Sequence, residues 1–161
     1  MKTGTAPEND GGHNDLSDPR PGRQTLRLSS TMESVSELET MAEQLAGQAG
    51  LDEDEVFRVT MAVREASVNA VLHGNEYDPA KEVIASFENT GADFIFKICD
   101  QGKGLNPDTL PDPTAPENLL RGTGRGIFLI RSLMDEVHFR QLHPGTELTL
   151  IKHLAQTGEK I

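Results

Sequence analysis

Near the middle of the chain, three side chains that can do chemistry together recur at helical spacing. Glu65, Asn69 and His73 stand at positions i, i+4 and i+8, so in a helix they share one face. A carboxylate one turn from a carboxamide can hold a metal ion or a water between them, and Mg²⁺ prefers such oxygen ligands. The alternative is the solvated polar face of an amphipathic helix.

A second group, Asp100-Gln101-Gly102-Lys103-Gly104, directly follows an apolar run. A carboxylate at the end of a strand can accept a hydrogen bond from an exocyclic amine. Glycines two and four residues later let the backbone approach a flat ring closely. The alternative is a plain turn, in which Asp-x-Gly is common.

The third group is Gly122-Thr123-Gly124-Arg125-Gly126, which we expect to open a helix over 127–134. Free N–H groups and the helix dipole at such a start form an anion site, and nearby basic residues favour polyphosphate. The spacing is neither the dinucleotide fingerprint nor a Walker loop. A flexible loop is the alternative.

Hydrophobic patterning indicates the elements that must position these groups. An apolar stripe over 53–72 predicts a helix that ends at His73-Gly74, and a similar stripe predicts a helix from Met32 to the glycines at 47 and 50. The expected strands cover 25–29, 81–88, 93–100, 137–142 and 147–154. This order predicts an α/β two-layer sandwich, with a mixed sheet of about five strands and helices on one face.

We divide the chain into a disordered tail over 1–24, a folded domain over 25–154 and a short C-terminal tail over 155–161. The first tail is rich in Gly, Pro and polar residues and cannot bury enough apolar surface to order itself. Residues 105–121 are rich in proline, and we expect them to form a lid that responds to a ligand.

Composition excludes several classes of protein. Lys and Arg number 15 and Asp and Glu 26, so the net charge is −11, which argues against nucleic-acid binding. No run approaches the roughly 20 apolar residues of a membrane span, and no secretory signal is visible. A single cysteine, Cys99, excludes an internal disulfide framework. We expect a cytoplasmic protein that binds neither a membrane nor nucleic acid directly.

Taken together, the three groups resemble the motifs of the GHKL (Bergerat-fold) ATP-binding family. Residues 65–74 are similar to its N box, 100–104 to its first glycine box and 122–126 to its second. Within the family, 65–74 most resemble the serine-protein kinase anti-sigma factor branch (RsbW-like, HATPase_c_2 type). The likeness covers about residues 25–154, and it implies the Bergerat fold.

The resemblance also implies roles for individual residues. Glu65 would be the general base that takes the proton from an acceptor serine. Asn69 would coordinate Mg²⁺ on the phosphates of ATP, and His73 would border the same pocket. Asp100 would bind the adenine amino group. The remaining nucleotide contacts would come from Gly102, Gly104, Gly122, Thr123, Gly124, Arg125 and Gly126.

The implied function is that of an ATP-dependent serine protein kinase that acts as an anti-sigma factor. It would sequester a sigma factor, phosphorylate a serine of an anti-anti-sigma protein, and associate as a homodimer. Two alternatives remain. The first is the catalytic domain of a histidine kinase, although the chain lacks an upstream helical hairpin with an acceptor histidine. The second is a binding module that responds to nucleotide without transferring phosphate.

Overall fold

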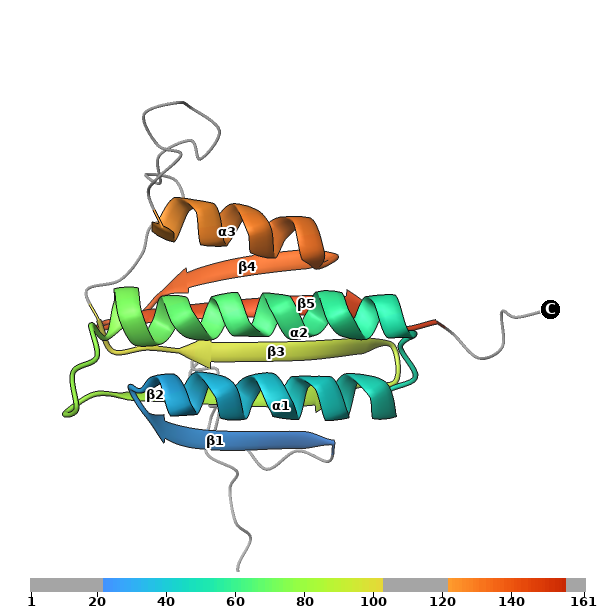
Figure 1. Cartoon of the computed structure of the whole chain (residues 1–161), viewed down its shortest axis with the longest axis horizontal. Helices are drawn as coiled ribbons and strands as arrows, with labels where there is room; N and C mark the ends of the chain where they lie inside the picture. The colour runs from blue at the N-terminus through green and yellow to red at the C-terminus, as the bar shows by residue number, and fades with distance from the viewer. Residues whose placement is uncertain (1–21, 103–121, 156–161) are drawn as a thin grey trace, which may run out of the picture.

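One layer of helices packs against one sheet in the computed structural model, which describes residues 22–102 and 122–155 (Figure 1). The strands are β1 (Arg23–Ser29), β2 (Glu82–Asn89), β3 (Asp93–Cys99), β4 (Glu136–Gln141) and β5 (Thr146–His153). The helices are α1 (Met32–Gln48), α2 (Glu53–Val68), a π-helix η1 (Asn69–Gly74) and α3 (Gly122–Leu133). The two-layer sandwich and its five strands are confirmed.

The strand order is β1-β2-β3-β5-β4. All four pairs are antiparallel, so the sheet of the described residues is antiparallel and not mixed as expected. The connections explain this. Two antiparallel helices separate β1 from β2, so the chain re-enters the sheet in the opposite direction. After α3, β4 runs in the same direction as β3, but β5 lies between these two strands.

Large side chains on the sheet and small ones on the helices build the core. Phe87 and Phe96 lie with their ring centroids 4.9 Å apart on the helix-covered face, and each buried ring contributes about 1.5–3 kcal/mol. Buried alanines let α1 and α2 approach the sheet closely, namely Ala42, Ala46, Ala62 and Ala66. The sheet therefore supports α2, which carries Glu65 and leads into Asn69.

Side-chain caps fix where α1 and α2 begin. Thr31 Oγ1 accepts a hydrogen bond from the Ser34 N–H at 3.2 Å, and Asp52 Oδ1 accepts one from the Glu55 N–H at 2.8 Å. These bonds satisfy donors that the first turn of a helix otherwise leaves unpaired. The sequence predicts both starts correctly. The expected strand from Thr25 begins two residues earlier, at Arg23.

Two helix boundaries differ from the expected ones, and both lie at the candidate site. The helix expected over 53–72 is α2 only to Val68, after which the chain continues as η1. Single π turns often occur at functional sites. Helix α3 begins at Gly122, five residues before the expected start at 127. The glycine-rich group thus lies within the start of the helix and not in a loop before it, and Gly126 lies against Asn69, the first residue of η1.

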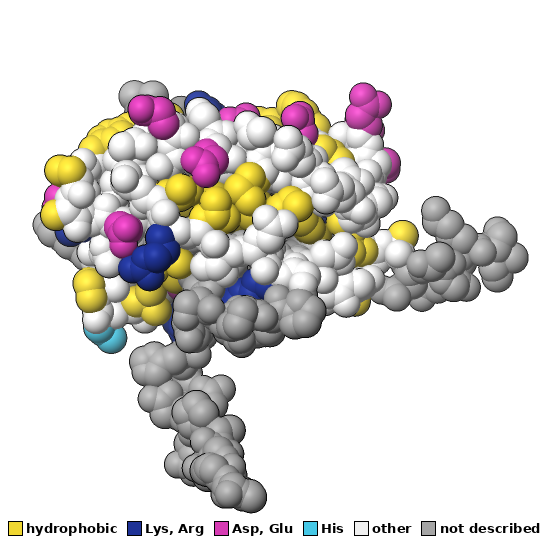
Figure 2. Space-filling view, turned by 90° about the horizontal axis from the view of Figure 1, so that it is seen from below, with side chains coloured by type: hydrophobic (Ala, Val, Ile, Leu, Met, Phe, Trp, Pro, Cys, Tyr) yellow, Lys and Arg dark blue, Asp and Glu magenta, His cyan; other side chains and the backbone are white. Residues whose placement is uncertain are grey.

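The acidity of the chain is spread over its surface. Glu33, Glu37 and Glu43 are exposed on α1, and Figure 2 shows separate acidic side chains on the face viewed from below. Dispersed carboxylates of this kind are typical of a solvated helix face. Among the helices of the described ranges, none is long and apolar enough to span a bilayer.

Candidate functional site

Asp100 follows β3, and its side chain is only 9% exposed. Its Oδ1 accepts a hydrogen bond from the Gly102 N–H at 2.9 Å, and its own N–H donates to the Thr146 carbonyl at 3.0 Å. Burial raises the pKa of this carboxyl, while hydrogen bonds from the backbone of Gly102 and Thr146 and the charge of Lys81 lower it. The result is a buried acceptor fixed by the backbone on two sides.

Glycines let three segments converge on Asp100. A Cβ added to Gly74, at the end of η1, would lie 2.4 Å from the Asp100 carboxyl. A Cβ on Gly102 would lie 1.9 Å from the Gly74 carbonyl oxygen, and one on Gly145 would lie 1.9 Å from the Asp100 carbonyl oxygen. Each distance is far inside van der Waals contact. A side chain at Gly102 or Gly145 would displace the backbone, and one at Gly74 would displace the Asp100 side chain.

Asn69 stands where α2 passes into η1, and it faces the start of α3. Its Nδ2 is buried and has no hydrogen-bond partner among the described residues. A Cβ on Gly126 would lie 3.2 Å from both Nδ2 and Oδ1 of Asn69. An unpaired buried amide is costly, and a half-turn about its Cβ–Cγ bond would place the oxygen in the same position. The amide is therefore aimed at a position that a ligand can occupy.

Glu65 lies one helical turn before Asn69 and is half-buried. Within the part of the chain that the structure describes, its carboxylate has neither a hydrogen bond nor an ion pair. His73 lies on η1 and is exposed. The shared face of the three residues stays a prediction, because the chain changes from α-helix to π-helix between Glu65 and His73.

The free N–H groups at the start of α3 fall on the glycine-rich group. Gly122, Thr123, Gly124 and Arg125 form the first turn of the helix, where backbone donors have no partner within the helix. These donors and the helix dipole favour an anion. Gly104 and the expected lid over 105–121 lie outside the described residues, as do Lys103 and Arg121.

Three residues near Asp100 have a role that the sequence does not indicate. Gly74 is only the last residue of a motif in the sequence, Gly145 only a turn residue, and Asn75 neither. Asn75 is fully buried, and its Oδ1 accepts a hydrogen bond from the Gln101 N–H at 2.7 Å. That contact joins residues 26 positions apart, so no local pattern could have indicated it. The Pro144-Gly145 pair was a signal for a turn, and only the fold shows that this turn touches Asp100.

Two other findings bear on which part of the molecule binds a ligand. Within the described ranges, no cluster of three or more His, Cys, Asp or Glu side chains could hold a metal ion. Mg²⁺ does not need one, because it commonly takes one or two protein ligands together with substrate phosphates. The single amide of Asn69 fits that pattern.

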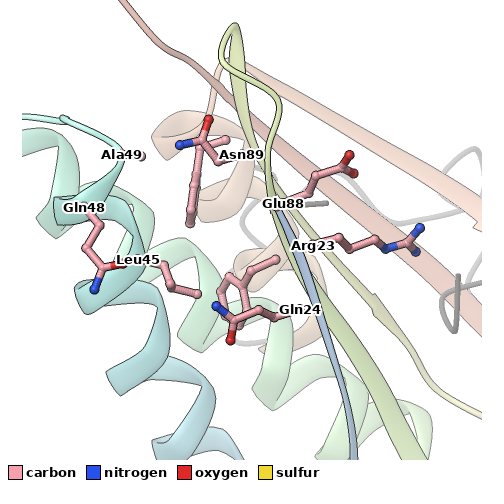
Figure 3. Close-up of a pocket in the computed structure, with 10 residues that line it drawn as sticks. Arg23, Gln24, Leu45, Gln48, Ala49, Glu88 and Asn89 are labelled. Atoms are coloured by element: carbon pink, nitrogen blue, oxygen red, sulfur yellow. The ribbon is translucent and has the colours of Figure 1, made fainter. Parts of the chain in front are cut away.

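A cavity of about 400 Å³ lies at the other end of the sheet, beside Asn89 and the end of α1 (Figure 3). Gln24, Gln48 and Asn89 border it, whereas Arg23 and Glu88 point away (Figure 3). Because no charged side chain is aimed into it, this cavity suits polyphosphate less well than the site around Asn69 and Asp100.

Comparison with known proteins agrees with this geometry. The sequence profile described as "Histidine kinase-like ATPase domain" matches residues 28–152. An anti-sigma F factor of Anoxybacillus flavithermus is 36% identical over 109 residues, covering 65% of this chain and 73% of that protein. The serine-protein kinase RsbW of Staphylococcus aureus is 30% identical over 148 residues, covering 84% and 92%.

A solved structure supports the fold. The crystal structure of the RsbU and RsbW domains of Rv1364c from Mycobacterium tuberculosis superposes with a TM-score of 0.55 at 17% identity. The match covers 81% of this chain and about a third of that longer one, 32%. The resemblance to the GHKL fold is confirmed. The chain therefore belongs to the histidine kinase-like ATPase family, in the branch of the anti-sigma F factors and RsbW serine-protein kinases.

Proposed function

We propose that residues 25–154 form an ATP-dependent serine protein kinase that acts as an anti-sigma factor. The observation that carries this proposal is Asn69 Nδ2, which is buried without a hydrogen-bond partner among the described residues, one turn from Glu65 and against Gly126 of α3. Asn69 would serve as the metal ligand, Glu65 as the carboxylate and the start of α3 as the anion site that transfer of a phosphoryl group requires. The names of the relatives support the same function.

The adenine end of the site is the buried carboxylate of Asp100. As an ionised acceptor it can take a hydrogen bond from the exocyclic amino group of adenine. Gly102 adds no side chain above the ring, and Gly104 has the same role by resemblance. A base with a carbonyl at that position would face the carboxylate unpaired, which disfavours its binding.

The phosphate end lies between Asn69 and α3. The residues 122–126 would hold the phosphates through their N–H groups, with Thr123 and Arg125 contributing as the resemblance implies. Asn69 would hold Mg²⁺, which when bound neutralises charge on the phosphates. His73 would border this part of the pocket.

Glu65 would be the general base. Its carboxylate accepts the proton of the acceptor serine as the serine Oγ forms a bond to the γ-phosphorus. The bond from that phosphorus to the β,γ-bridging oxygen breaks, and ADP leaves with the bond's electron pair. The products are phosphoserine on the partner, ADP and the protonated carboxyl, which then loses its proton to water.

The names of the relatives support the choice of partners. We propose a sigma factor as the sequestered partner and an anti-anti-sigma protein as the serine acceptor, with the kinase acting in the cytoplasm as a homodimer. Phosphorylation of the acceptor would end its competition for the kinase, so transfer of the γ-phosphoryl group from ATP would be linked to release or capture of the sigma factor.

The test separates binding from chemistry with Glu65→Gln. Glutamine keeps the size of the side chain but accepts no proton at neutral pH. ADP affinity should change by less than about tenfold, or about 1.4 kcal/mol, while serine phosphorylation falls about 10²–10⁴-fold. Glu37→Gln, at an exposed position of α1, is the matched control and should change neither. Full phosphotransfer by the Glu65 variant would exclude the assigned base.

A further inference from the structure

Asn75 lies directly after η1 and is 0% exposed. Both Nδ2–H groups of its side chain donate hydrogen bonds, and its Oδ1 accepts one. Oδ1 accepts from the Gln101 N–H at 2.7 Å. Nδ2 donates to Ser30 Oγ at 2.8 Å and to the Glu82 carbonyl at 3.0 Å. This one amide therefore joins the β1–α1 connection, the start of β2 and the segment after β3.

Two of these bonds belong to a closed circle of three residues. Gln101 donates its N–H to Asn75, Asn75 donates Nδ2–H to the Glu82 carbonyl, and the Glu82 N–H donates to Gln101 Oε1 at 2.8 Å. A closed circle fixes the backbone of Gln101 from both its N–H and its side chain. Networks of this kind, when fully satisfied, favour one rigid arrangement.

The residue next to Gln101 is Asp100. On its other side, the Asp100 N–H is held by the Thr146 carbonyl at 3.0 Å. Gly74, the neighbour of Asn75, lies against the Asp100 carboxyl so closely that an added Cβ would be 2.4 Å away. Asn75 thus determines the distance between the end of η1 and the Asp100 segment.

We propose that Asn75 is a positioning residue for base recognition, which sets the direction of the Asp100 carboxylate toward the amino group of adenine. The inference rests on the proposed function, in which Asp100 binds adenine. Only a side chain with both a donor and an acceptor completes the circle at this length. Aspartate lacks the donor, and leucine lacks both.

The test compares Asn75→Ala with Ser30→Ala. The serine variant removes one bond of Nδ2 and the bond from Ser30 Oγ to the Lys81 carbonyl. It leaves the circle with Gln101 and Glu82 intact, so it is a control for loss of buried hydrogen bonds at the same place. The probes are ADP and inosine diphosphate, in which a carbonyl oxygen replaces the amino group of adenine. Binding is measured by calorimetry and stability by urea unfolding.

Wild-type protein should prefer ADP over inosine diphosphate by at least about tenfold, because the wrong base leaves Asp100 unpaired. Ser30→Ala should keep this ratio, and Asn75→Ala should reduce it to within about threefold. Both variants lower the urea midpoint, so only the ratio reports positioning. A ratio retained in Asn75→Ala, or lost equally in both variants, overturns the inference.

Two further readouts keep the outcomes distinct. If wild-type protein binds both nucleotides equally, the assignment of Asp100 is wrong and the inference falls with it. If Asn75→Ala does not fold, Asn75→Ser replaces it, and hydrogen exchange of the Gln101 amide is measured in the wild type. That amide should exchange as slowly as those of β3. Fast exchange would show that Asn75 does not hold it.

Discussion

Replacing Gly126 by alanine should move stability and metal-dependent binding in opposite directions. Gly126 is the fifth residue of the twelve-residue α3, and glycine within a helix costs about 1 kcal/mol relative to alanine. The added methyl would lie 3.2 Å from both polar atoms of the Asn69 amide. The amide must therefore move by a few tenths of an ångström. Because it makes no hydrogen bond among the described residues, little opposes that movement.

The net effect on folding should be a gain of up to about 1 kcal/mol. The effect on Mg-ATP should be a loss, because Mg²⁺ requires ligands at about 2.0–2.1 Å in near-octahedral geometry. We expect the Kd of Mg-ATP to rise by about tenfold, or about 1.4 kcal/mol. With the metal chelated, the Kd of ATP should change less.

Calorimetry with and without Mg²⁺, beside urea unfolding, measures both quantities. Gly47→Ala in α1 is the control, because an added Cβ there meets no atom within 4 Å. It should raise the urea midpoint without changing Mg-ATP binding. If the two variants bind Mg-ATP equally well, the assignment of Asn69 to the metal is wrong.

Three further predictions concern the segment around Asp100. Gly102→Ala forces a Cβ to within 1.9 Å of the Gly74 carbonyl oxygen; it should cost about 1–3 kcal/mol in urea unfolding and abolish ADP binding, and retained binding would contradict the close approach. Burial raises the pKa of Asp100, so on acidification the ADP affinity should begin to fall at a higher pH than it would for an exposed aspartate. The folded state also binds this proton more tightly than the unfolded state, so lowering the pH from the folded to the unfolded pKa should stabilise the fold, and Asp100→Asn should lose that gain in stability. Burial and Glu147 raise the pKa of Cys99 to about 12, so its thiol should react with an aromatic disulfide reagent at neutral pH far more slowly than free cysteine; equal rates would refute this.

The places of the candidate site residues in the fold could be predicted from the sequence because their spacing is local. Glu65 and Asn69 are one helical turn apart, and Asp100 and Gly102 are joined by a hydrogen bond across two residues. The starts of α1 at Met32 and of α2 at Glu53 were predictable for the same reason, since a helix cap is a local contact.

The supporting contacts could not be predicted because they join distant parts of the chain. Asn75 forms hydrogen bonds with Ser30, 45 residues away, and with Gln101, 26 residues away. Position 145 needs glycine for its turn and also because a Cβ there would lie 1.9 Å from the Asp100 carbonyl oxygen. The glycine-rich group was expected to open a helix over 127–134, and the helix already includes it, since α3 begins at Gly122. No glycine or proline within 69–73 signals the π turn of η1.

The proposed kinase activity is tested most directly by phosphate transfer to a partner. The purified chain is used in pull-downs from the native cell, once with ATP and once with ADP, and the retained proteins are incubated with γ-labelled ATP and Mg²⁺. We predict label on a serine of one small retained protein, identified by mass spectrometry, and its loss with Glu65→Gln at nearly unchanged ADP affinity. Label on a histidine, or ATP binding without any transfer, would contradict the proposed function.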